Sequence, residues 1–105
     1  MKEENCPKMP VPMQLMRGRL VGYDADRMVL EFTMMHGARI VDCEMSGAAL
    51  DDLADVKGTR PGERAAQFAL LRDVIERVAS DTFVAMGMPQ GVTIRIFSKH
   101  VKGQR

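Results

Sequence analysis

The sequence has little of what several classes of function depend on. Its 15 basic residues are balanced by 14 acidic ones, so the net charge is +1, which gives no long-range field for capturing nucleic acid or an anionic lipid surface. Tryptophan is absent, and the aromatic residues are one tyrosine and four phenylalanines. Most of these rings are needed in the core, so few remain to stack on bases. Only a local basic patch would support nucleic-acid binding.

Cysteine and long apolar runs are equally scarce. Cys6 lies in a proline-rich start and Cys43 in a predicted strand, a pattern that matches neither a disulfide framework nor a zinc site. No apolar run approaches the ~20 residues of a membrane span, and the first five residues do not begin a secretory signal. We therefore expect a cytoplasmic protein with no membrane partner.

The strongest pattern that is present predicts a long helix over residues 61–86. Pro61 suits its first turn, and Gly87 followed by Pro89 is a stop signal. The apolar arc is wide and extends to Leu70, so we expect it to contact both a sheet and a second helix. Steps of three and four residues separate the positions that define it, which are Phe68, Leu71, Ile75, Val78, Thr82 and Met86.

Residues 15–45 are predicted to form three strands, separated by turns at 24–26 and 36–37. If His36 and Gly37 form a two-residue loop, Phe32 pairs with Val41, Leu30 with Cys43 and Met28 with Met45. All of these pairs are apolar, and a slip of one residue would turn each side chain to the other face. The sequence therefore predicts that Cys43 is a buried small hydrophobe and not a nucleophile.

The opposite face of this hairpin would pair Glu31 with Asp42. Like charges across a strand pair are destabilising, so we expect solvent, a neighbouring arginine such as Arg39 or Arg95, or a ligand to offset them. Paired carboxylates perform acid–base chemistry when one raises the pKa of the other. The sequence supplies no pocket for such a site, and a hydrated outer face is the interpretation that it favours.

The remaining segments complete one domain. Ser46 is a good N-cap for a short helix over 47–55, residues 56–62 are predicted to be a turn, and 91–98 alternate as a half-buried strand does. The Gly-x-x-x-Gly spacing in 56–62 lacks the Gly-Lys-Ser/Thr ending of a phosphate loop. We expect a flexible arm over 1–14, a single domain over 15–98 and a basic tail over 99–105.

Soft-metal binding is an alternative for the start of the chain. Cys6 and the thioethers of Met9, Met13 and Met16 are ligands that suit Cu(I). Ten methionines are scattered through the sequence, however, and most are needed to fill gaps in a core. The sequence therefore predicts no metal site, no cofactor-binding residue and no catalytic residue.

Several core and turn positions form a recognisable pattern, which consists of Tyr23-Asp24, Val29-Leu30-Glu31-Phe32, Gly37, Val41-Asp42-Cys43-Glu44-Met45-Ser46, Ala49-Leu50, Phe68, Arg72, Ile75 and Ala79. This pattern resembles a bacterial family catalogued as domain of unknown function 1488. The likeness covers about residues 20–97. It implies the fold, and it implies no activity and no active-site residues.

The predicted fold is α+β: a small antiparallel sheet, built from a three-stranded meander and a C-terminal strand, with a short and a long helix packed on one face. The function that we expect is that of a small non-catalytic domain that binds a protein partner or forms a homo-oligomer. The alternative is weak nucleic-acid binding, which would use Arg17, Arg19, Arg39, Arg95 and the tail residues Lys99, Lys102 and Arg105. An enzyme would need Glu31, Asp42 and Cys43, against the predicted register.

Overall fold

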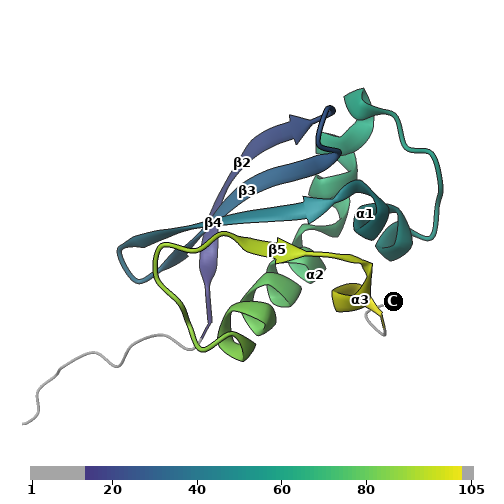
Figure 1. Ribbon diagram of the computed structural model, residues 1–105. Coiled ribbons are helices and arrows are strands. Elements are labelled where there is room, and N and C mark those ends of the chain that lie inside the picture. Colours follow the sequence, from purple (N-terminus) through teal and green to yellow (C-terminus); the bar gives the residue numbers. More distant parts are fainter. Residues whose placement is uncertain (1–13, 103–105) are drawn as a thin grey trace, which may run out of the picture.

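The computed structural model describes residues 14–102 and confirms the predicted α+β fold (Figure 1). A four-stranded sheet has the order β2-β3-β4-β5, and a long helix passes behind it. The strands are β2 (Met16–Asp24), β3 (Val29–His36), β4 (Arg39–Ser46) and β5 (Ile94–Ile96). The helices are α1 (Gly47–Ala54), the 3-10 turn η1 (Pro61–Glu63), α2 (Arg64–Ala85) and α3 (Ser98–Val101).

The last strand is parallel to its neighbour, so the sheet is mostly and not wholly antiparallel. Ile94 pairs with Cys43 and Ile96 with Met45 in a parallel ladder. The reason is the length of α2, whose 22 residues span about 33 Å. This helix returns the chain to the end of the sheet where β4 begins, and the following strand therefore runs in the direction of β4 (Figure 1).

The β3–β4 hairpin closes on Gly37 and Ala38, and the predicted His36-Gly37 loop was wrong by one position. Gly37 has φ 63°, as the first residue of a two-residue turn does when glycine occupies that place. Each strand partner therefore moves by two residues: Phe32 faces Cys43 and Leu30 faces Met45. Because a shift of two keeps every side chain on its face, the predicted burial of Cys43 is confirmed although its predicted partner was wrong.

The core lies between one face of the sheet and the helices. Ile75 has no exposed surface, and Ser46 caps α1 by accepting a hydrogen bond from the backbone N–H of Ala49 at 3.1 Å. The predicted extension of the α2 arc to Leu70 was wrong, because none of the described elements covers that side of the helix and Leu70 is 87% exposed. The largest fully buried side chains are Phe32, Phe68, Phe83, Leu30, Met34, Met45, Leu50, Ile75, Ile94, Ile96 and Cys43.

The C-terminal strand and tail differ from their predicted forms. The final strand is shorter than 91–98, and residues expected in the tail form α3, in which Val101 is buried and His100 Nδ1 accepts from the backbone N–H of Phe97 at 2.8 Å. The boundary placed at 98 therefore falls inside packed structure. Residues 1–13 of the predicted arm, with the proposed soft-metal ligands Cys6, Met9 and Met13, lie outside the described residues.

Candidate functional site

Within residues 14–102, no element covers the face of the sheet turned away from the helices (Figure 1), and this uncovered face carries an apolar row across three strands. Met16 pairs with Met35, and Met35 pairs with Ile40, so the three side chains share this face. Met16 is 62% exposed and Ile40 is 63% exposed. Val92 borders the row, because it lines a small hollow of about 100 Å³ together with Ile40. We call Met16, Met35 and Ile40 the apolar row.

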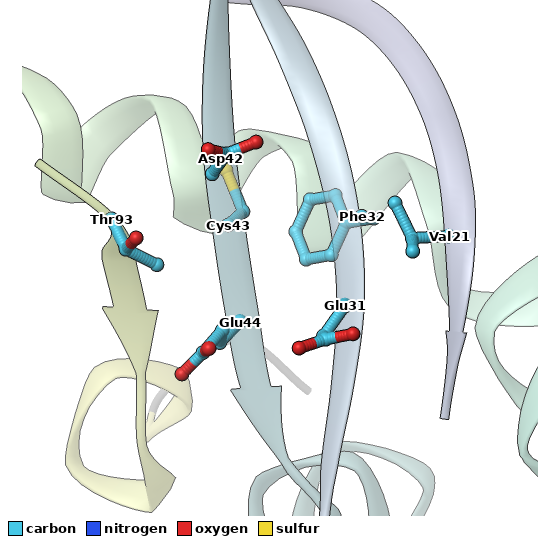
Figure 2. A pocket seen from close by; sticks show the side chains of 7 residues that line it. All are labelled: Val21, Glu31, Phe32, Asp42, Cys43, Glu44 and Thr93. Atoms are coloured by element: carbon cyan, nitrogen blue, oxygen red, sulfur yellow. The ribbon is translucent and has the colours of Figure 1, made fainter. Parts of the chain in front are cut away.

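Next to the apolar row, the same face holds an acidic hollow of about 280 Å³ (Figure 2). Glu31 and Glu44 lie directly opposite each other there, so the predicted Glu31–Asp42 pair was wrong by the two-residue shift of the hairpin. Asp42 still lines the hollow, one strand position from Cys43. The full lining consists of Val21, Glu31, Phe32, Asp42, Cys43, Glu44 and Thr93.

Arginines from this chain neutralise the paired carboxylates. Arg27 donates to Glu44 at 2.9 Å and to Glu31 at 3.4 Å, and Arg95 donates to Glu44 at 3.3 Å. The hydrogen bond from Arg27 lowers the pKa of Glu44 by more than its burial raises it. Arg95 was predicted to offset a Glu31–Asp42 pair, and it contacts Glu44 instead. Arg27 was not foreseen, because the turn that places it was interpreted only as a break between strands. Glu44 is therefore ionised at neutral pH and unsuited to donate a proton.

Cys43 is equally unsuited to chemistry on this face. Its side chain points into the core, where only 1% of the residue is exposed. Burial raises the pKa of the thiol to about 12, and the charge of Asp42 adds to this effect. Since the thiolate is the reactive species, Cys43 is an inert thiol at neutral pH, as the sequence predicts.

A second polar cluster, centred on Arg64, was missed by the sequence analysis. Arg64 is 4% exposed and donates to Asp51 and Gln67, each at 2.7 Å, while its guanidinium lies 5.2 Å from the centre of the Tyr23 ring. Thr59 also donates to Asp51, at 2.5 Å. The cluster thus ties α1, the segment before η1 and the start of α2 together.

The charges of this cluster stabilise the fold, because Asp51 is ionised and hydrogen-bonded to its neighbours. Burial raises the pKa of Asp51, but hydrogen bonds from Gln67, Thr59 and Arg64 outweigh it and bring the pKa to about 2. Gly47 permits the close packing, because a Cβ at that position would lie 2.8 Å from Arg64 Nη2. The sequence indicates this cluster only through polar residues, such as Arg64 and Gln67, on otherwise apolar helix faces. That pattern does not show which polar side chains contact each other.

The arginines on which nucleic-acid binding rested are partly engaged. Arg17 bridges to Asp73 at 2.8 Å and to Glu76 at 2.9 Å. On α2, Arg72 pairs with Glu76 at 2.9 Å. Together with the Arg95–Glu44 contact, these ion pairs leave fewer cations for phosphate.

Two other kinds of site are absent from residues 14–102. None of the helices there is long and apolar enough to cross a membrane. No group of three or more histidine, cysteine, aspartate or glutamate side chains in that range is arranged to hold a metal ion.

Comparisons with known proteins agree on a family without a known activity. A family model described as "Protein of unknown function (DUF1488)" matches residues 18–96. No curated protein matches the chain. A crystal structure of a protein of unknown function from the same family, from Shewanella loihica PV-4, is similar with a TM-score of 0.65 and 17% sequence identity, and the match covers 83% of this chain and 96% of that one. At this identity the similarity extends to the fold alone.

Proposed function

The chain belongs to the DUF1488 family of proteins of unknown function, and from this premise we propose that it is a non-catalytic cytoplasmic domain that acts by protein association through the uncovered face of its sheet. The observation that carries the proposal is the apolar row. Single exposed apolar residues are ordinary, but three that adjoin one another across neighbouring strands form a continuous apolar surface. Exposed surfaces of this kind mark sites of interaction.

The edges of the sheet are poorer candidates for association than its face. The pairing of β2 with β3 is irregular between Arg17 and Gly22, and irregular edge strands resist strand addition. In that stretch Arg72 donates to the carbonyl oxygen of Gly18 at 3.1 Å. At the other edge, β5 is only three residues long. Association by the face is therefore favoured.

The chemistry of the same face supports a binding role over catalysis. Glu44 is held ionised by Arg27 and Arg95, and the thiol of Cys43 is buried with a raised pKa. A carboxyl group that acts as a general acid needs a raised pKa, and a thiol that acts as a nucleophile needs a lowered one. The unpaired, buried Cys43 also suits a reducing compartment such as the cytoplasm.

Site-specific photo-crosslinking in cells tests the proposal. A photoreactive amino acid replaces Ile40 in the apolar row or, as the control, Leu70, which is the more exposed apolar residue but lies on α2. We expect a discrete covalent protein adduct from position 40, which disappears when Met35→Lys is added, and no such adduct from position 70. Absence of an adduct at position 40, or equal adducts at both positions, would contradict association through this face.

A further inference from the structure

We propose that Met16 and Met35 of the apolar row form a site of reversible oxidation, at which hydrogen peroxide converts the two thioethers to sulfoxides and so weakens association through the uncovered face. The inference rests on the proposed function and names a chemical control of it. Met16 lies directly opposite Met35 in the β2–β3 ladder. Side chains in that arrangement have Cβ atoms about 5 Å apart. The two sulfurs, which we call the methionine pair, therefore belong to one small surface.

The fold leaves the methionine pair open to a small oxidant and protects the methionines of the core. Met16 is exposed and Met35 is half-buried on the uncovered face. Met34, the neighbour of Met35 in the chain, packs in the core and is only 1% exposed, and Met45 has no exposed surface. Successive residues of a strand point to opposite faces, so an accessible and a protected methionine are adjacent in the sequence. Oxidation is therefore directed to the outer face.

The oxidation needs no catalytic group from the protein. A lone pair of the thioether sulfur attacks one oxygen of hydrogen peroxide, an S–O bond forms and the O–O bond breaks. The proton on the transferred oxygen passes to the departing oxygen, which leaves as water. Sulfur loses two electrons and the peroxide gains them, so the products are one methionine sulfoxide and one water. Methionine sulfoxide reductases reverse the change: two thiols are oxidised to a disulfide, and the sulfoxide oxygen leaves as water.

The thiol of Cys43 does not compete for the oxidant. It lies in the core, and burial raises its pKa to about 12. The thiolate is the form of cysteine that reacts with oxidants, and little of it is present at neutral pH. A thioether has no proton to lose, so its reactivity does not depend on such a pKa. Within residues 14–102, the oxidation chemistry of the uncovered face therefore belongs to the methionine pair.

Oxidation changes the free and the associated domain unequally. In the free domain the sulfoxide oxygens are hydrated, because the uncovered face is in contact with water, and the fold is little affected. In the associated domain the same oxygens are buried against an apolar surface of the partner. A buried polar group without a hydrogen-bond partner costs free energy, and we expect association to weaken roughly tenfold or more. Oxidation thus acts on association and not on folding.

Peptide mass spectrometry tests the site itself. After hydrogen peroxide treatment of the folded protein, fragment ions should place the added oxygen on Met16 and Met35, while Met34 and Met45 stay unmodified. In concentrated urea, where the core is open, all four should be oxidised. Oxidation of Met34 as readily as Met35 in the folded protein, or protection of the methionine pair, would overturn the proposal.

The effect on association is measured with the photoreactive residue at position 40. The purified protein is oxidised, freed of peroxide and titrated into an extract of the cells that gave the adduct. The concentration that gives half of the maximal adduct should rise roughly tenfold or more, and purified methionine sulfoxide reductases with dithiothreitol should restore it. Dithiothreitol alone should not, because it reduces oxidised cysteine, such as Cys6, but not methionine sulfoxide. Restoration by dithiothreitol alone would overturn the proposal.

Two double variants assign the effect to the methionine pair. Met28 and Met86 are also exposed, but they lie in the turn before β3 and at the end of α2, outside the apolar row. Met28→Leu with Met86→Leu should keep the full response to peroxide. Met16→Leu with Met35→Leu should abolish the response, measured against untreated protein of the same variant. Equal responses in the two double variants would overturn the proposal.

The remaining outcomes separate a failed fold and a failed function from a failed oxidation site. Urea unfolding of the oxidised wild type should match that of the untreated protein, and a lower midpoint would assign the loss of adduct to the fold and overturn the proposal. No adduct from untreated wild type rejects the proposed function and the oxidation control with it. An adduct that forms equally well before and after oxidation rejects the oxidation control alone and supports the proposed function.

Discussion

Glu31 and Glu44 lie directly opposite each other across the β3–β4 ladder, and the guanidinium of Arg27 contacts both carboxylates. Like charges in this position normally destabilise a pair of strands. Arg27 reaches them from the turn between β2 and β3, so a connecting segment supplies the charge that the ladder itself lacks. Arg27 contacts both carboxylates, whereas Arg95 of β5 contacts Glu44 alone.

Replacing Arg27 by glutamine should lower the urea midpoint of unfolding at neutral pH, because the repulsion between Glu31 and Glu44 is then offset by Arg95 alone. Adding Glu31→Gln should recover most of the loss, since one of the two like charges is then removed. Arg77→Gln is the matched control, because Arg77 is an exposed arginine with no salt bridge within residues 14–102. Equal losses for Arg27→Gln and Arg77→Gln would show that the bridge contributes nothing.

The hairpin shows how far the sequence specifies this face. Alternation placed Phe32 and Cys43 in the core correctly, because burial selects one of two faces and a two-residue shift does not change the face. The partners themselves depend on which residue of the turn takes a positive φ, and Gly37 fits either of the two central positions. The sequence therefore predicts the core of the sheet but not which carboxylates meet.

Long-range polar contacts were the least predictable part. Asp51 and Arg64 are 13 residues apart and belong to different helices, and nothing in their local sequence shows that they meet. The parallel direction of β5 was missed for a similar reason, because it depends on where α2 ends relative to β4. In contrast, the α2 core position Ile75 and the cap Ser46 follow from local periodicity and capping chemistry, and both were predicted.

Acid should weaken the domain through Asp51. Its pKa in the folded state is about 2, below its ordinary value of 3.8, so the ionised form is favoured by folding. The resulting stabilisation is present above about pH 4 and is lost as the pH falls toward 2. A shift of this size corresponds to about 2 kcal/mol.

Urea unfolding at pH values between 7 and 2 measures this dependence. Asp51→Asn should remove most of it and should reduce the free energy of unfolding at pH 7 by about 3–5 kcal/mol, because Arg64 is then left buried without its counter-charge. Asp52→Asn, at the neighbouring exposed position, should leave the pH profile unchanged. An unaltered acid profile in Asp51→Asn would mean that other groups determine the acid sensitivity.

Gly47 should not tolerate a side chain, although it lies in a helix. Alanine is favoured over glycine in a helix by about 1 kcal/mol, but its Cβ would come within 2.8 Å of Arg64 Nη2 and 3.1 Å of the Tyr23 hydroxyl. We expect Gly47→Ala to lower the free energy of unfolding by about 1–3 kcal/mol, as overpacking does. Gly62→Ala is the control, since a Cβ there meets no atom within 4 Å. If urea unfolding shows a higher free energy of unfolding for Gly47→Ala, the side chain of Arg64 can move to accommodate the added Cβ, and the prediction is wrong.

Oligonucleotides should bind weakly, which separates protein association from the nucleic-acid alternative. Arg17 and Arg95 are engaged with carboxylates of this chain, and affinity for nucleic acid comes largely from phosphate contacts with free cations. We expect fluorescence anisotropy to give dissociation constants no tighter than about 10⁻⁴ M at physiological salt. Because α3 is packed, the contribution of the end of the chain is tested by Lys99→Gln with Lys102→Gln and not by truncation. Micromolar binding that falls steeply with salt, and that this double variant weakens, would favour a nucleic-acid partner over a protein.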